Sequence, residues 1–142
     1  MKKILTFAIL LSLMVGITAC SDRKQSPKGQ VKPTKAVLGV IGSNKYYFEG
    51  LDRKDRKVKH TFQIKNVGTD PLVINDIQLN CNCLKADYTK KPIAPGQTGE
   101  VTLTVQLDKL EDGHFRRVVY VYSNDKDSPF PLELFGDLPQ RP

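Results

Sequence analysis

KVKHTFQIKN, residues 57–66, decides the fold class, because its apolar and polar residues alternate along the whole stretch. Val58, His60, Phe62 and Ile64 would face one side of an extended chain, and the residues between them would face the other. Strict alternation over this length is typical of a half-buried β-strand and not of a helix. The stretch therefore predicts a strand with one face against a core.

Three neighbouring stretches also indicate strands. GEVTLTVQLD (99–108) and PFPLELFG (129–136) alternate in the same way. FRRVVYVYSN (115–124) has apolar residues at both parities, as expected of a central strand with a covered face. No stretch from residue 44 onward has helical periodicity, so the domain is expected to be all-β.

Turn residues and one change of parity complete this prediction. PLVINDIQLN (71–80) changes parity near Asn75 and Asp76, which predicts a β-bulge. The pairs Pro95-Gly96 and Asp112-Gly113 mark turns between the runs. About seven short strands separated by turns predict an immunoglobulin-like antiparallel β-sandwich.

The N-terminus predicts export. Lys2 and Lys3 precede the apolar run ILTFAILLSLMVGIT (4–18), which is too short for an ordinary membrane span. The run leads through Ala19 into Cys20, an arrangement that resembles the lipobox of bacterial lipoproteins. The resemblance implies cleavage before Cys20, a diacylglycerol on its thiol and an acyl chain, such as palmitate, on the new amine.

These signals divide the chain into four parts. We expect a lipoprotein signal peptide over residues 1–19, then a lipidated cysteine and a flexible basic tether over 20–43. The immunoglobulin-like domain is expected over 44–137 and a frayed tail over 138–142. Within the tether, the apolar residues 36–41 are a candidate for a short leading strand.

The residues after Cys20 bear on the membrane and its side. Ser21 stands where aspartate would be expected for retention at an inner membrane, so by analogy with other lipoproteins we expect the outer membrane. Asp22 is followed at once by Arg23 and Lys24, so the acidic run that resembles a surface-export tag is absent. We therefore expect the domain on the periplasmic side.

The charge and the scattered polar residues argue against two classes of function. The net charge of +7 falls to +5 once Lys2 and Lys3 are removed, and no basic stripe with aromatic side chains is present, so we expect no nucleic-acid partner. Ser43, Ser123 and Ser128 lack the glycines of a nucleophile elbow, so we expect no enzyme and no cofactor.

Cys81 and Cys83 leave several possibilities open. Export favours a disulfide, but residues i and i+2 of an extended strand lie too far apart, so the bond requires a turn at Asn82. Two packed free thiols are a second possibility. A copper or redox site is a third, although His60 and His114 lack zinc-ligand spacing. His60 is expected at the edge of the core and His114 in solvent.

Four motifs carry a family resemblance. An aromatic stretch at 46–50 precedes the strand that ends in Asn66-x-Gly68, and Cys-Asn-Cys at 81–83 is followed by the stretches 92–105 and 112–125. Their order resembles the bacterial DUF1573 family over about residues 44–136.

The resemblance implies an immunoglobulin-like sandwich related to major-sperm-protein and Hydin-type domains, in exported proteins and lipoproteins that often come from Bacteroidota. It implies no established activity. Family members usually carry glycine at the position of Asn82 and a small hydroxyl residue at that of Leu84, and asparagine tolerates the left-handed backbone that such a glycine indicates. We expect a non-catalytic binding or assembly module with a protein partner, and a thiol or metal-binding protein as the alternative.

Overall fold

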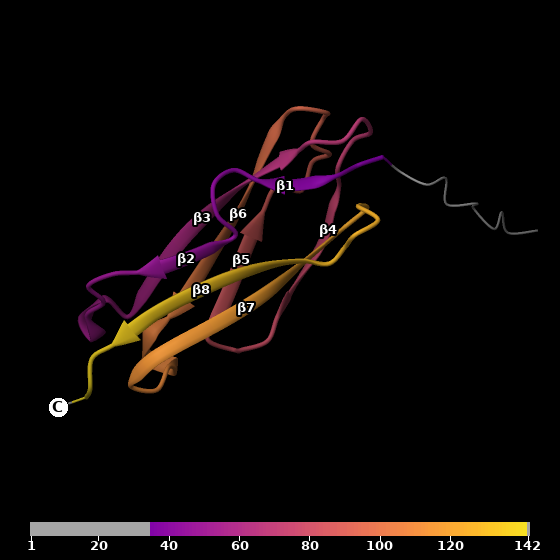
Figure 1. The fold of residues 1–142 in the computed structure, drawn as a ribbon. Coiled ribbons are helices and arrows are strands. Elements are labelled where there is room, and N and C mark those ends of the chain that lie inside the picture. Colours follow the sequence, from indigo (N-terminus) through magenta and orange to yellow (C-terminus); the bar gives the residue numbers. More distant parts are fainter. Residues whose placement is uncertain (1–34, 142) are drawn as a thin grey trace, which may run out of the picture. The chain divides into compact units, whose positions relative to one another are not determined.

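The computed structural model of the chain describes residues 35–141, which form two β-sheets whose inner faces share one core (Figure 1). Sheet A has the strand order β1-β3-β6-β5 and sheet B the order β2-β8-β7-β4. In chain order the strands are β1 Leu38–Val40, β2 Lys45–Phe48, β3 Lys57–Asn66, β4 Ile74–Leu79, β5 Leu84–Tyr88, β6 Thr98–Gln106, β7 Gly113–Ser123 and β8 Phe130–Leu138. The predicted all-β, immunoglobulin-like sandwich is confirmed.

The sandwich has eight strands in the described residues and not about seven, and one pair of strands is parallel. The strand missing from the prediction is β5, Leu84–Tyr88, which directly follows the two cysteines. The parallel pair arises because the first strand is split between the sheets. β1 pairs with β3 in sheet A, and β2 lies at the edge of sheet B, parallel to β8. Residues 41–44 connect the two strands, and Gly42 in this connection has a φ of +86°. Such a φ favours glycine.

The predicted alternation along β3 is confirmed. Phe62 and Ile64 are buried, Val58 and His60 are partly buried, and Lys59 on the other face is exposed. β6, which pairs with β3 in antiparallel register, also alternates. Its inward side chains, Val101, Leu103 and Val105, are fully buried. These rows form the inner face of sheet A, and the inward side chains of sheet B, such as Leu132 and Leu134, pack against them to complete the core.

The predicted irregularity in β4 and two predicted turns are also present. The register between β4 and β7 shifts between Ile74 and Asp76, which allows Ile74 and Ile77 both to be buried. Gly96 and Gly113 follow Pro95 and Asp112 with φ values of +76° and +90°. These left-handed conformations explain why glycine follows each turn signal.

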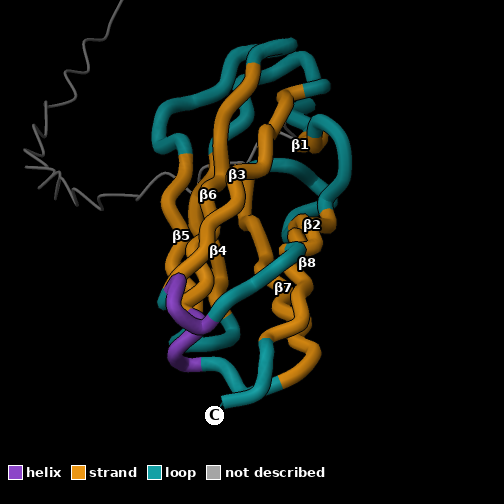
Figure 2. Tube along the Cα trace, turned by 90° about the vertical axis from the view of Figure 1, so that its left-hand side faces the viewer, coloured by secondary structure: helices purple, strands orange, loops and turns teal. Residues whose placement is uncertain are grey.

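The domain extends beyond the predicted bounds at both ends. β1 lies within the range predicted as tether, because Leu38 is buried and pairs with Asn66. At the other end Leu138 belongs to β8 and is buried, and the Arg141 amide donates to Asp112 Oδ2. Figure 2 shows this end of the chain beside the short 3₁₀ helices Arg53–Asp55 and Leu107–Lys109. The predicted signal peptide, Cys20 and tether residues 20–34 lie outside the described residues.

Candidate functional site

Sheet B is not paired along the whole length of β7. β8 pairs with β7 from Gly113 to Val121, but β4 pairs only with residues from Val119 to Ser123. In the described chain, residues 113–118 therefore have β8 on one side and no strand on the other. We call this open side of residues 113–118 the β7 edge. Exposed edges of this kind can accept a strand from another chain.

The β4–β5 turn lies beside the β7 edge. It carries both cysteines, and the Leu84 amide donates to Cys81 O at 3.2 Å, as in an ordinary β-turn. The turn at Asn82 is present as predicted, but its left-handed backbone is not. Among the described non-glycine residues only Arg56 has a positive φ. A turn without positive φ has no need of glycine, which explains why asparagine is accepted here.

Within this turn the two sulfurs are brought together. Their Sγ atoms are adjacent, and the two Cα atoms lie 5.1 Å apart. The Cys83 amide donates to Cys81 Sγ at 3.0 Å. Cys83 is fully buried in the core, whereas Cys81 is partly exposed. The disulfide itself stays a prediction.

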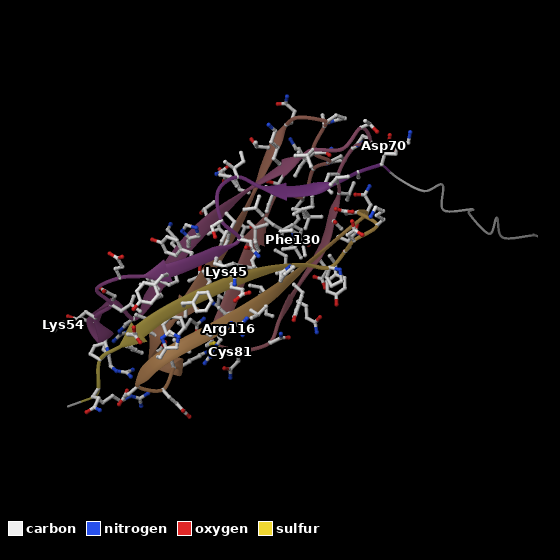
Figure 3. The ribbon with its side chains drawn as sticks, viewed as in Figure 1. Lys45, Lys54, Asp70, Cys81, Arg116 and Phe130 are labelled. Atoms are coloured by element: carbon white, nitrogen blue, oxygen red, sulfur yellow. A yellow bond between two sulfur atoms is a disulfide. The ribbon has the colours of Figure 1, made fainter. Side chains whose placement is uncertain are left out.

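A hollow of about 530 Å³ opens between the β4–β5 turn and β7. We call it the cysteine hollow. It is lined by Asn80, Cys81, Asn82, Leu84, Arg116, Arg117, Val118 and Tyr120. Figure 3 shows Cys81 and Arg116 close together along the edge of sheet B. The hollow combines an open strand edge, polar turn groups and two arginines.

The two arginines face opposite sides of sheet B. Arg116 points outward, and its Nε and Nη2 donate to Glu133 Oε2 at 2.9 and 2.8 Å. The hydrogen bond from Arg116 lowers the pKa of Glu133, and the nearby Lys45 ammonium acts in the same direction. Arg116 is therefore paired with a carboxylate on the neighbouring strand of the same sheet.

Arg117 has no such partner. It shares the inward face of β7 with Phe115 and Val119, both buried. Its Nη1 donates to Arg116 O at 2.9 Å, but its buried Nε has no hydrogen-bond partner among the described residues. A buried donor left without an acceptor is destabilising, and more so on a charged group. An anionic group in the cysteine hollow would relieve this cost.

Sequence reasoning missed Arg117, although the sequence held a signal for it. In FRRVVYVYSN, Phe115, Val119 and Val121 share one parity, and Arg117 shares it too. An arginine in line with three core residues is an exception to the binary pattern of a strand. Such exceptions are expected at functional positions, and this one lies in the cysteine hollow.

A second polar cluster ties three strands of sheet B together. Asp137 accepts hydrogen bonds from the Tyr47 hydroxyl and from His114 Nδ1, the latter at 3.0 Å. The bond from Tyr47 lowers the pKa of Asp137 and raises that of Tyr47. All three side chains are exposed, which confirms the prediction for His114. The cluster joins β2, β8 and β7 on the outer face, away from the cysteine hollow.

The remaining predicted residues lie apart from this site. His60 is at the edge of the core as expected, stacked on Tyr46 at 3.5 Å between ring centroids, and burial lowers its pKa. The hydroxyl oxygens of Ser43, Ser123 and Ser128 each accept a backbone amide. Within residues 35–141, no three histidine, cysteine or acidic side chains are grouped as metal ligands. No helix in that range is long and apolar enough to cross a bilayer.

Comparisons with known proteins add a family and a fold. A family model described as "Protein of unknown function (DUF1573)" matches residues 40–138. No curated protein sequence matches the chain. A protein of unknown function from Porphyromonas gingivalis W83 has a similar structure, with a TM-score of 0.62 and 17% identity. The match covers 75% of this chain and 48% of that one, so this chain spans about half of that protein's length.

Two further structures share the fold at lower identity. The ASH / PapD-like domain 7 of human CEP192 is similar over 78% of this chain and 89% of its own, with a TM-score of 0.54 and 9% identity. The secreted serine protease VesC from Vibrio cholerae is similar over 71% of this chain but only 23% of its own, with a TM-score of 0.51 and 12% identity. At these identities the likeness establishes the sandwich fold alone.

Proposed function

We propose that this chain, which belongs to the DUF1573 family of proteins of unknown function, carries a sandwich domain that acts as a non-catalytic binding module of the bacterial cell envelope. The observation that carries the proposal is the β7 edge, open over residues 113–118 beside the cysteine hollow. A strand edge offers backbone hydrogen bonds to an extended segment, and a neighbouring pocket selects its side chains. The partner is a protein of the same compartment.

The chemistry of the described side chains supports a binding role over a catalytic one. Each serine that could serve as a nucleophile already accepts a backbone amide with its hydroxyl oxygen. A nucleophile needs a neighbouring base and a third group that orients the base. The exposed Tyr47–Asp137–His114 cluster contains no such nucleophile.

Anchoring through Cys20 is the second part of the proposal. The motif before Cys20 supports lipidation, and each buried acyl CH₂ contributes about 0.8 kcal/mol, so two or three chains anchor a protein stably. The residues after Cys20 support an outer-membrane position with the domain in the periplasm. The tether begins at Cys20 and enters the sandwich at β1, so the domain would act near the membrane surface.

Position-specific photo-crosslinking in living cells tests the binding role. A photoreactive amino acid replaces Asn82, which is exposed at the rim of the cysteine hollow, and in a matched variant it replaces Lys59, which is exposed on sheet A. We expect one defined protein adduct from position 82 and none from position 59. Equal adducts from both positions, or none from position 82, would remove the basis for a partner at the β7 edge.

Membrane fractionation tests the anchor separately. The unaltered chain should partition into detergent with the membranes, and Cys20→Ala should not be lipidated and should leave the membrane fraction. If Cys20→Ala stays with the membranes, the anchor is not a lipid on this residue. Digestion of the domain by protease added to intact cells would contradict the periplasmic position.

The rival function is a thiol or metal site at Cys81 and Cys83. We propose a disulfide that shapes the β4–β5 turn, because the proposed compartment is oxidising and the turn brings the two Cα atoms to 5.1 Å, within the range of a disulfide. So small a loop contributes at most about 1.5 kcal/mol to stability. Intact mass with and without alkylation decides: two reactive thiols in freshly isolated protein exclude the disulfide. Stoichiometric copper or zinc that is lost on Cys81→Ser would favour the rival.

A further inference from the structure

The backbone groups that face the β7 edge follow from the hydrogen bonds of β8. The Glu133 amide donates to Asn44 O at 2.8 Å, on the β2 side of β8. Glu133 therefore points its backbone groups away from β7, where its partner in the register is Val118. Val118 and Glu133 therefore form a non-hydrogen-bonded pair, in which each residue points its backbone groups away from the other. Val118 thus points its N–H and C=O at the β7 edge. Alternate residues face the same side, so Arg116 and His114 do likewise.

Two other contacts agree with this assignment. The Asn124 amide donates to Val73 O, on the β4 side of β7, and Asn124 has the same parity as Val118. Arg116 O accepts Arg117 Nη1 in place of a strand amide. The backbone amides of His114, Arg116 and Val118 thus face the β7 edge in the spacing that an added strand requires, and the strand's amide would replace Arg117 Nη1 at Arg116 O.

Side chains of an added strand would alternate between solvent and the space between the sheets. A residue placed opposite Arg117 would face inward, in a pair without direct backbone hydrogen bonds, where side chains approach most closely. No carboxylate of the described residues forms an ion pair with Arg117, and its buried Nε has no acceptor. A carboxylate at that position would pair with the guanidinium in a charge-assisted geometry.

We propose that the partner presents an extended acidic segment, which adds to the β7 edge as an antiparallel strand and places one aspartate or glutamate side chain against Arg117. The proposal rests on the proposed function and names the chemistry of its ligand. In antiparallel register, the residue two positions after the acid lies opposite Phe115, which is buried and apolar. The recognised pattern is therefore an acidic residue, any residue, then an apolar residue.

The charges of the chain disfavour two other occupants of the β7 edge. The chain's own residues 21–36 carry five basic residues and a single acidic one, Asp22, and would be repelled by the arginines. A second copy pairing edge to edge about Arg116 would place like charges directly opposite one another, which is destabilising. An acidic segment of another protein meets neither obstacle.

Peptide binding to the full-length chain in detergent micelles tests the proposal. The probe is a fluorescent peptide with blocked ends, Thr-Thr-Glu-Thr-Val-Thr-Thr, whose binding is followed by anisotropy. One control peptide has glutamine in place of glutamate. The other has proline in place of the threonine between glutamate and valine, where the strand must donate an amide opposite Arg116. We expect each control to bind at least about tenfold more weakly.

Protein variants locate the contact. Arg117→Gln should remove the preference for glutamate over glutamine, whereas Arg116→Gln, the neighbouring arginine on the outer face, should change affinity less than about threefold. Hydrogen exchange with bound peptide should slow at the amides of His114, Arg116 and Val118. If Arg117→Gln does not fold, the two control peptides with the unaltered chain decide the question.

Three results would overturn the proposal. One is equal binding of the glutamate and glutamine peptides. Another is an equal loss of peptide affinity in Arg116→Gln and Arg117→Gln, since general positive charge would then explain binding. The third is a hydrogen-exchange result in which bound peptide slows exchange elsewhere in the chain but not at the amides of the β7 edge. A crosslinked partner at position 82 without glutamate preference would reject the acidic ligand and leave the binding module standing. Glutamate-dependent peptide binding without a crosslink at position 82 would support the acidic ligand and reject the cellular partner at that position.

Discussion

Asn66 shows how one buried polar side chain joins three segments of the fold. It is fully buried at the end of β3. Its Nδ2 donates to Asp70 O at 2.8 Å and to Ile93 O at 2.9 Å, and its Oδ1 accepts the Gly68 amide at 2.9 Å. The side chain therefore supplies hydrogen-bond partners to backbone groups of two loops, which would otherwise have none from this position.

Replacing Asn66 should be among the most harmful changes to stability. Asn66→Ala leaves one buried amide and two carbonyls without this partner, at about 1–3 kcal/mol for each group that water cannot reach, so we expect a loss near 3 kcal/mol. Urea unfolding measures it. Gln63→Ala, which breaks only an exposed bond to Glu100, is the control and should cost less than about 0.5 kcal/mol. Equal losses would contradict the role assigned to Asn66.

Gly68 has a steric reason to be glycine. A Cβ at this position would lie 2.0 Å from Lys35 O and 2.6 Å from Val37 N. The chain that enters β1 passes directly over Gly68, and the Thr69 amide donates to Lys35 O at 2.9 Å. The Asn66-x-Gly68 motif thus combines a buried amide with room for the incoming chain.

His60 should make stability depend on pH in a narrow window. Burial lowers its pKa, so in the folded state it stays neutral at pH values where the unfolded state, with a pKa of about 6.5, is protonated. The unfolded state then binds more protons, and stability falls as pH falls below about 6.5. Glu133 and Asp137, whose pKa values are lowered, respond at lower pH. Between pH 7.5 and 5.5, the free energy of unfolding of His60→Phe, measured with urea, should decrease less than that of the unaltered chain. An equal decrease would show that other groups cause the pH dependence.

At the scale of elements, β3 organises sheet A. It pairs with β1 and β6, and its inward side chains run from the partly buried Val58 to the fully buried Ile64. On its outer face Thr61 shares a hydrogen bond of 2.8 Å with Thr102 of β6. The strand therefore carries a dry face and a wet face, as its alternation predicts.

Two substitutions in β3 test this assignment of faces. Phe62→Ala should lower the free energy of unfolding by about 3–5 kcal/mol, because Phe62 is 2% exposed in the core. Lys59→Ala on the outer face should change it by less than about 0.5 kcal/mol. Both changes are measured by urea unfolding of a fragment of residues 35–142. Similar losses from the two variants would mean that the inward face is wrongly assigned.

At the scale of the whole molecule, the sandwich depends on a short strand that the predicted domain start at residue 44 leaves out. β1 covers the edge of β3, and Ala36 and Leu38 are buried. Lys35 N donates to Asp70 Oδ2, and the Leu38 amide donates to Asp125 Oδ2 of the β7–β8 connection. These contacts link the start of the described chain to both sheets.

Two fragments test this dependence. A fragment of residues 35–142 should fold on its own, with a circular dichroism spectrum of β-sheet and little helix. A fragment of residues 44–142 should lose about 3 kcal/mol or more, because burial of Leu38 and Ala36 is lost and the end of β3 is exposed. Thermal and urea unfolding compare them. Equal stability would show that β1 is dispensable, and a helical spectrum of the longer fragment would contradict the fold.

The sequence by itself determined the class of fold, most of the strands and several local details, but not the short edge strand β5. Alternation in β3 and β6, the irregularity of β4 and the turns at Gly96 and Gly113 depend on side-chain period and backbone freedom, which are properties of neighbours along the chain. The number of strands and the spacing of the turns indicated the immunoglobulin-like arrangement, and the family pattern of motifs implied it independently. Even the parity that Arg117 shares with Phe115, Val119 and Val121 was present in the sequence.

Only the tertiary structure decided what that parity means. β4 ends opposite Val119 and turns into sheet A. Residues 113–118 therefore keep β8 on one side but have no strand on the other, and Arg117 lies beside the cysteine turn. The end of one strand against another depends on long-range register, which no local pattern encodes. The split of the first strand between the sheets and the ordinary turn at Asn82 have the same origin, because contacts from distant segments set the backbone there.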